Sequence, residues 1–97
     1  MSTDIWRIEV PNLPRRLYIA QRGLCFHCGK PMLPTVYRKD GQTHDAGWTR
    51  EHVVPKSLGG RNDKNIVLAH LGCNMRRGAD HPTPEMIERA REIWNRV

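Results

Sequence analysis

The chain has 97 residues, with sixteen Lys and Arg against ten Asp and Glu, so its formal net charge is +6. A single domain of this length, residues 1–97, buries only roughly 60–65% of the surface that its unfolded chain exposes, and we expect an added stabilising element. No apolar run reaches the ~20 residues that cross a bilayer, and the N-terminal residues lack the pattern of a secretion signal, which predicts a soluble, cytoplasmic protein without a membrane partner. The basic charge favours a polyanionic partner such as nucleic acid, although inert solvated surfaces share it.

The first predicted elements are a short alternating segment and a helix. Residues 5–10 alternate apolar and polar side chains, which predicts a strand or an anchored arm. Asn12 can cap a helix, and Gly23 can end it. The apolar face of this helix consists of Leu13, Leu17, Ala20 and Leu24.

A metal-binding knuckle is predicted over residues 25–28, where two residues separate Cys25 from Cys28. A tight turn after the first cysteine directs both thiolates toward one ion. A redox dithiol has the same spacing, but it requires a preceding strand in a βαβ unit, which the sequence lacks. His27 lies between the two thiols, and we expect its side chain on the surface or against a phosphate.

Two strands and a helix are predicted after an irregular stretch over residues 32–49, which has possible strand pieces around residues 36–37. Val53 and Val54 predict a strand over residues 48–55, because β-branched side chains favour strands and Pro55 can only end one. The elements that follow are a loop over 57–63, a second strand over 65–69 and a short helix over 73–77 that ends at Gly78.

The C-terminal segment predicts a helix over about residues 84–97. Thr83 and Pro84 suit its N-cap and first helical position. Apolar residues at helical spacing form one stripe that is expected to pack in the core: Met86, Ala90, Ile93, Trp94 and Val97. His44 and His81 have no partner pattern and are expected on the surface.

His70 and Cys73 repeat the two-residue gap of Cys25 and Cys28. Structural zinc prefers four ligands that Cys and His supply as two close pairs. The alternative is that His70 ends a buried strand and that Cys73 is a small core residue. The matched spacing favours a structural Zn²⁺ held by all four side chains, and this ion would stabilise so small a domain.

Glu51, His52 and Asn74 have the side chains that metal-dependent phosphodiester hydrolysis requires. Histidine exchanges a proton near neutral pH, which suits His52 as a general base. Glu51 and Asn74 offer oxygen ligands to Mg²⁺ or Mn²⁺. Neighbouring strand residues point to opposite faces, so Glu51 and His52 can meet at one point only if the strand is distorted. Each residue alone is more commonly a surface, turn or cap residue, whereas the ordered set favours a site.

The order of these residues resembles the HNH nuclease family. The matching positions, within about residues 17–78, are Glu51-His52-x-x-Pro55, Gly59-Gly60, Asn65, Cys73-Asn74 and Arg76-Arg77-Gly78. The resemblance implies an α+β fold with a ββα-metal (HNH or His-Me finger) core over residues 50–78, flanking helices and the structural zinc site of one subgroup. It also implies catalytic roles for Glu51, His52, Asn65 and Asn74, with His52 at the strand end and the Asn65 amide holding the loop backbone.

Three positions depart from the family pattern. Asn74 stands where the family name implies His, a frequent variant that favours a hard ion such as Mg²⁺. His70 stands where the zinc pair usually has Cys. Gly78 occupies a position at which the colicin DNases have another metal-binding His, so a site of that type is not expected.

The resemblance implies an endonuclease that cleaves DNA with a divalent cation, leaves 5′-phosphate and 3′-hydroxyl ends, and nicks one strand per encounter. Phosphate contacts should dominate, so binding of double-stranded DNA should weaken with salt and show little sequence preference. The residues predicted to contact DNA are Arg76, Arg77, Lys56, Arg61 and Lys64. Similar stand-alone chains are encoded by bacteriophages and mobile elements, some beside a DNA-packaging terminase, which implies a monomer in the host cytoplasm.

The alternative is a non-catalytic, zinc-stabilised module that binds nucleic acid or protein. In such a module the cysteines and the basic residues matter, whereas Glu51, His52 and Asn74 do not. A degenerate family member that retains the fold without catalysis is a third possibility, and the intact motif positions argue against it.

Overall fold

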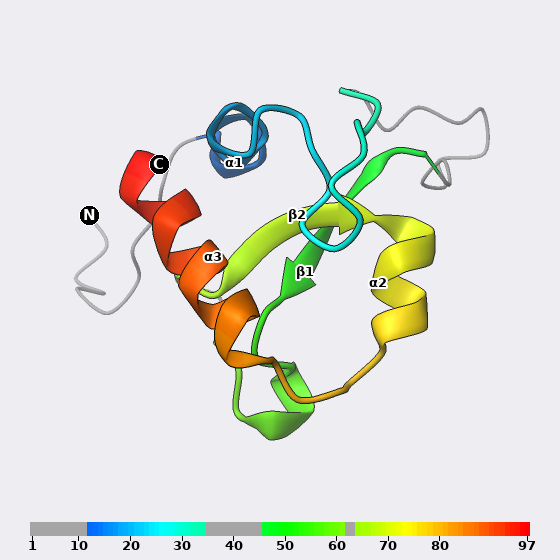
Figure 1. The fold of residues 1–97 in the computed structure, drawn as a ribbon, viewed down its shortest axis with the longest axis vertical. Helices are drawn as coiled ribbons and strands as arrows, with labels where there is room; N and C mark the ends of the chain where they lie inside the picture. The colour runs from blue at the N-terminus through cyan, green and yellow to red at the C-terminus, as the bar shows by residue number, and fades with distance from the viewer. Residues whose placement is uncertain (1–11, 35–45, 62–63) are drawn as a thin grey trace, which may run out of the picture.

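The computed structural model describes residues 12–34, 46–61 and 64–97, which form a small mixed α/β domain (Figure 1). The elements in these ranges are the helices α1 (Leu13–Ala20), α2 (Leu71–Arg77) and α3 (Pro84–Arg96), the strands β1 (Trp48–His52) and β2 (Ile66–His70), and the short 3₁₀ helix η1 (Lys56–Leu58). The possible strands over residues 5–10 and around residues 36–37 lie outside the described part of the chain. None of the described helices is long and apolar enough to span a bilayer.

The two strands form an antiparallel hairpin in which Trp48 lies opposite His70 and His52 lies opposite Ile66. The first strand is shorter than predicted, because the ladder ends at His52 rather than near Pro55. Val53 nevertheless stays buried, and its N–H donates to the Asn65 carbonyl at 3.0 Å. The second strand begins and ends one residue later than predicted.

Strand β2 runs through the core of the domain. Its first four residues are all buried, and Val67 and Leu68 are fully enclosed. Helices α1 and α3 pack against β2 and against each other, while α2 packs against both strands. Figure 1 shows α2 on the side of the hairpin away from α3. Burial from both sides explains why this strand is a continuous apolar run without polar alternation.

The outer edge of β2 is covered by Gln21, the residue that directly follows α1. Gln21 is buried, its Oε1 accepts the Leu68 N–H at 2.7 Å, and its Nε2 donates to the Leu68 carbonyl at 2.8 Å. The Phe26 N–H donates to the same carbonyl at 3.0 Å. A buried backbone group costs free energy unless it is paired, so this amide takes the place of a neighbouring strand.

Helix α1 ends earlier than predicted. The Gly23 N–H donates to the Tyr18 carbonyl and the Arg22 N–H donates to the Ile19 carbonyl, a Schellman pattern in which Arg22 has a φ of 55°. Leu24 therefore lies beyond the helix and is 38% exposed, so its predicted place on the apolar face is wrong. Asn12 does occupy the N-cap position, but its side chain makes no capping hydrogen bond.

Helix α3 follows the prediction closely. The Thr83 hydroxyl accepts the Met86 N–H at 3.2 Å, and Pro84 is the first helical residue. Ala90 and Ile93 are buried. The other members of the predicted stripe, Met86, Trp94 and Val97, pack against the core as partly buried residues. The stripe thus holds the C-terminal helix on β2.

Candidate metal centre

Cys25, Cys28, His70 and Cys73 converge at one end of the hairpin, with one ligand atom from each residue within 4.8 Å of all the others. In residues 12–34, 46–61 and 64–97, this is the one group of three or more His, Cys, Asp and Glu side chains that gathers in this way. Tetrahedral zinc with Zn–S of about 2.3 Å and Zn–N of about 2.0–2.1 Å has its sulfur and nitrogen ligand atoms roughly 3.5–3.8 Å apart. The group is therefore compatible with a structural zinc ion.

The knuckle that carries the first two thiols is a tight turn. The Gly29 N–H donates to the Cys25 carbonyl at 3.0 Å, and the Cys25 N–H donates to the Lys30 carbonyl at 2.9 Å. Gly29 has a φ of 73°, a conformation that glycine adopts without strain. The N–H groups of His27 and His70 lie 3.4 Å and 3.3 Å from the Cys25 sulfur. Both N–H groups donate to this sulfur, which fixes its position in the turn.

His70 presents its Nδ1 atom to the thiols. This nitrogen lies 3.3 Å from the Cys28 sulfur and 3.9 Å from the Cys73 sulfur. The Nε2 atom lies 2.9 Å from the Pro31 carbonyl oxygen, to which an N–H at this position donates. A neutral imidazole carries one proton, so this contact leaves the Nδ1 lone pair for a metal ion.

Two of the thiols differ in how readily they ionise. Desolvation raises the pKa of Cys28, but hydrogen bonds from the Lys30 backbone, Cys25 and Cys73 outweigh it, and the net pKa lies below the ordinary value. Burial raises the pKa of Cys73, and the neighbouring sulfurs of Cys25 and Cys28 raise it further. A cation that binds here must therefore displace a proton from Cys73.

Glu51 is a buried carboxylate on β1, with 4% of its surface exposed. Its Oε2 atom lies 2.8 Å from Nε2 of His27, and its Oε1 atom lies 3.5 Å from Nη1 of Arg77. A buried charge is costly unless it is paired, and these two groups pair it. The expectation that His27 points to the surface is wrong, since its side chain turns inward and is 16% exposed.

Arg77 binds the end of β1. Its Nη1 atom donates to the His52 carbonyl at 2.8 Å, and its Nη2 atom donates to the Val53 carbonyl at 2.6 Å. Only 9% of this side chain is exposed, and the contacts that the structure shows for it are structural. Its contact with DNA stays a prediction. The other residues predicted to contact DNA, Arg76, Lys56, Arg61 and Lys64, are exposed.

Asn74 reaches from α2 to β1. Its Nδ2 atom donates to the Thr49 hydroxyl at 3.2 Å and to the Arg50 carbonyl at 3.1 Å. Thr49 and Glu51 are two residues apart in the strand, so their side chains lie on the same face, which is the face toward α2. Asn74 and Glu51 therefore share this side of the hairpin. Thr49 has no place in the predicted set, because a strand threonine has no sequence pattern that distinguishes it from a surface residue.

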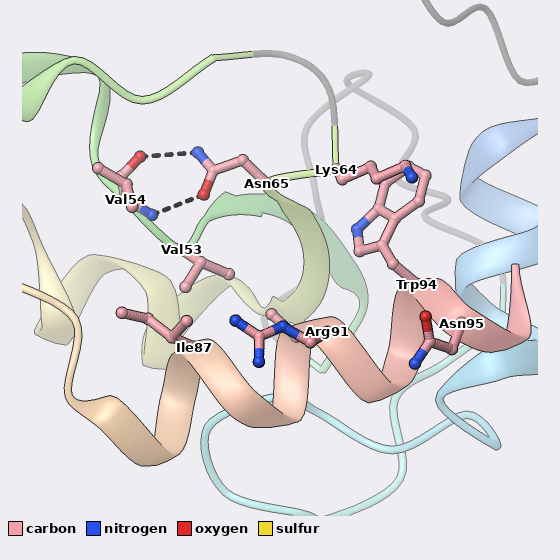
Figure 2. A pocket seen from close by; sticks show the side chains of 9 residues that line it. Val53, Val54, Lys64, Asn65, Ile87, Arg91, Trp94 and Asn95 are labelled. Atoms are coloured by element: carbon pink, nitrogen blue, oxygen red, sulfur yellow. Dashed lines mark hydrogen bonds between the residues drawn. The ribbon is translucent and has the colours of Figure 1, made fainter.

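Asn65 fastens the end of the loop that leaves β1. Its Oδ1 atom accepts the Val54 N–H at 2.8 Å, and its Nδ2 atom donates to the Val54 carbonyl at 2.8 Å (Figure 2). The same Nδ2 atom also donates to the Arg61 carbonyl at 3.3 Å. The contact with the loop backbone that was expected of this amide is present. Gly60 makes the contact possible, since an added Cβ would overlap the Val54 carbonyl.

His52 is the last residue of β1 and is half-buried. As the strand neighbour of Glu51, it belongs to the opposite face by alternation. The His52 carbonyl accepts a hydrogen bond from Arg77. Two residues later, the Val54 N–H donates to Asn65. The convergence of the imidazole with Glu51 and Asn74 on one cation stays a prediction.

A cavity of about 340 Å³ lies between α3 and the loop after β1, away from the cysteine cluster (Figure 2). Val53, Ile87 and Trp94 supply its apolar wall, while Lys64 and Arg91 supply charge at its margin. Asn65 lines this cavity, but Glu51 and the Cys₃His group do not. The apolar lining indicates a packing feature beside the loop.

No model of a known protein family matches the chain, and a search of curated proteins finds no similar sequence.

Proposed function

We propose that the protein is a divalent-metal-dependent DNA endonuclease of HNH type, whose Cys₃His group holds a structural zinc. The observation that carries the proposal is the position of Asn74, whose side chain extends from α2 to the Arg50 carbonyl beside Glu51. A carboxylate from a strand and a carboxamide from the following helix are thereby brought to one side of the hairpin. The order β1, β2, α2 also agrees with the order that the resemblance implies.

Each side chain has a distinct task in this proposal. Glu51 and Asn74 supply oxygen ligands for Mg²⁺ or Mn²⁺, which when bound neutralises charge on the scissile phosphate. His52 accepts a proton from the attacking water as general base. Asn65 holds the loop that follows His52 and so restricts the position of that strand end.

The phosphate backbone is held by exposed cations near these groups. Arg76 lies on α2, the helix that carries Asn74, and Lys56, Arg61 and Lys64 surround the loop between the strands. Contacts of this kind give affinity without sequence preference. We therefore propose double-stranded DNA as substrate, cleaved one strand at a time with low specificity.

A second candidate is a zinc-stabilised module that binds nucleic acid without cleaving it. The observation that favours it is the engagement of both Glu51 carboxylate oxygens, one by His27 and the other by Arg77. A purely structural ion pair requires no further partner. In this case the basic residues alone account for binding.

A plasmid-nicking assay separates the two candidates. Zinc-loaded protein is incubated with supercoiled plasmid, with and without Mg²⁺ or Mn²⁺, beside His52→Ala and the surface control His81→Ala. Omission of the ion, rather than chelation, leaves the zinc in place. The nuclease proposal requires metal-dependent nicking that His52→Ala loses while it retains its zinc content, melting temperature and DNA affinity. If neither protein nicks the plasmid with either ion while both bind DNA equally, the result would favour the binding module.

A further inference from the structure

His27 connects the cysteine cluster to Glu51. It lies between Cys25 and Cys28 in the knuckle, and its Nε2 atom is 2.8 Å from the Glu51 Oε2 atom. The two residues are 24 positions apart in the chain. A residue between two metal ligands thus reaches the carboxylate that the proposed function assigns to the catalytic cation.

The backbone of His27 and of the residue before it is held by hydrogen bonds. Its own N–H lies 3.4 Å from the Cys25 sulfur, and the preceding N–H, of Phe26, donates to the Leu68 carbonyl of β2 at 3.0 Å. The Phe26 carbonyl accepts from Arg89 Nη1 at 2.6 Å, and the Arg89 guanidinium lies 4.5 Å from the Phe26 ring centroid. The knuckle therefore presents His27 from a fixed place relative to β2.

The imidazole ring has little room to turn away. It stands edge-on to the buried Phe26 ring, with centroids 5.4 Å apart and an interplanar angle of 78°. Its side chain is 16% exposed. Because the backbone and the ring plane are both restrained, the knuckle fixes the orientation of the His27 ring that contacts Glu51.

The Glu51 carboxylate is in turn held at both oxygens. Arg77 approaches Oε1 at 3.5 Å while it donates to two carbonyls of the β1 end, and His27 approaches Oε2. An ionised carboxylate oxygen has two lone pairs, so one hydrogen bond leaves a lone pair on Oε2 for a cation. Partners that bond to a metal-binding carboxylate fix its orientation.

We propose that His27 is a positioning residue that holds the Glu51 carboxylate in place for the catalytic cation and so ties that site to the cysteine knuckle. This inference rests on the proposed function. Removal of such a partner typically weakens metal affinity or activity by about 10–100-fold. The loss belongs to the binding of the divalent ion and not to the general base, so the half-saturating ion concentration should change more than the maximal rate.

Three substitutions of His27 provide a matched test. His27→Ala removes the donor. The amide nitrogen of Gln lies about as far from the backbone as Nε2 of His, whereas that of Asn reaches only as far as Nδ1, so His27→Gln retains the reach and His27→Asn does not. We expect Mn²⁺ affinity, measured by electron paramagnetic resonance on zinc-loaded protein, to fall by about 10–100-fold in the Ala and Asn variants and to recover in part in the Gln variant. Zinc content and His81→Ala serve as controls.

The outcomes separate this inference from the proposed function. Unchanged Mn²⁺ affinity in His27→Ala, beside normal nicking, overturns the inference and leaves the nuclease intact. A pattern in which Gln and Asn behave alike also overturns it, because reach would then not matter. If the unsubstituted protein neither binds Mn²⁺ nor nicks DNA, the proposed function fails, and the positioning of a cation ligand fails with it.

A double-mutant cycle tests the contact without any divalent ion. The unfolding equilibria of His27→Ala, Glu51→Gln and the double variant should show a coupling of roughly 2-fold or more in the equilibrium constant. A coupling factor near one would show that His27 does not hold Glu51. His27→Gln, measured with Glu51 intact, replaces the cycle if Glu51→Gln fails to fold.

Discussion

Substitution of Asn65 by Ala should destabilise the loop between the strands and should also reduce the proposed nicking activity. The change removes two hydrogen bonds of 2.8 Å to the Val54 backbone and one of 3.3 Å to the Arg61 carbonyl. A neutral hydrogen bond contributes about 0.5–1.5 kcal/mol net, so the two short ones together suggest a loss of about 1–3 kcal/mol. Val54 is half-buried, and water can replace part of this contact. In a domain of this size the melting temperature should then fall by about 5–20 °C.

The assay compares urea unfolding and plasmid nicking for Asn65→Ala, Asn65→Asp and Asn95→Ala. Asn65→Asp retains the acceptor for the Val54 N–H but sets an anion against the Val54 carbonyl, and it should be no more stable than Asn65→Ala. Asn95 is an exposed residue of α3 that lines the same cavity, and its replacement should change stability by less than about 0.5 kcal/mol. If Asn65→Ala matches the Asn95→Ala control in stability and in nicking, the amide does not hold the loop and the reasoning is refuted.

Three further predictions concern the metal, the loop and the two arginines. Removal of zinc by a strong chelator, or Cys28→Ala, should abolish the cooperative thermal transition, because structural zinc contributes apparent binding energies of about 10–16 kcal/mol in zinc-finger peptides. An unchanged thermal transition would show that zinc does not stabilise this fold. Gly60→Ala should destabilise the protein by about 2 kcal/mol or more in urea unfolding, since its methyl group overlaps the Val54 carbonyl, and a neutral result would contradict that overlap. Arg77→Ala should lower the free energy of unfolding by about 3–5 kcal/mol, because Glu51 loses one of its two partners. Arg76→Ala should lower it by about 1 kcal/mol or less and should mainly reduce DNA affinity and the salt dependence of binding. A larger loss of stability in Arg76→Ala than in Arg77→Ala, measured by urea unfolding, would contradict the structural role of Arg77.

Local patterns predicted the parts of the fold that depend on neighbouring residues. The Thr83 cap and the Pro84 start of α3 follow from backbone requirements that hold within one helical turn. The apolar run of β2 and the convergence of the two spaced pairs, Cys25 with Cys28 and His70 with Cys73, were also correctly predicted. Burial from both sides and the requirements of a tetrahedral site each impose a short, recognisable order. In each case the partner atoms are close in sequence, or the residue types themselves restrict the partners.

Contacts between distant residues could not be predicted in this way. Gln21 meets Leu68 from 47 positions away, and nothing around Gln21 distinguishes it from a surface residue of a helix end. His27 and Arg77 were expected to face solvent or DNA, yet both converge on Glu51, because a buried carboxylate requires partners and the packing of the knuckle and α2 supplies them. The early end of α1 likewise depends on a non-glycine residue at positive φ, which propensity disfavours.

The glutamine that covers β2 also bears on aggregation. A bare, uncharged, apolar strand at the margin of a two-stranded sheet is a template on which a second molecule can add its own strand. Proteins usually discourage such growth with a lysine or a proline on the strand itself, and β2 has neither. The Gln21 amide already binds the outward N–H and C=O of Leu68, so an added strand cannot pair there. Because this protection comes from outside the strand, β2 needs no charged or proline residue of its own and can be apolar.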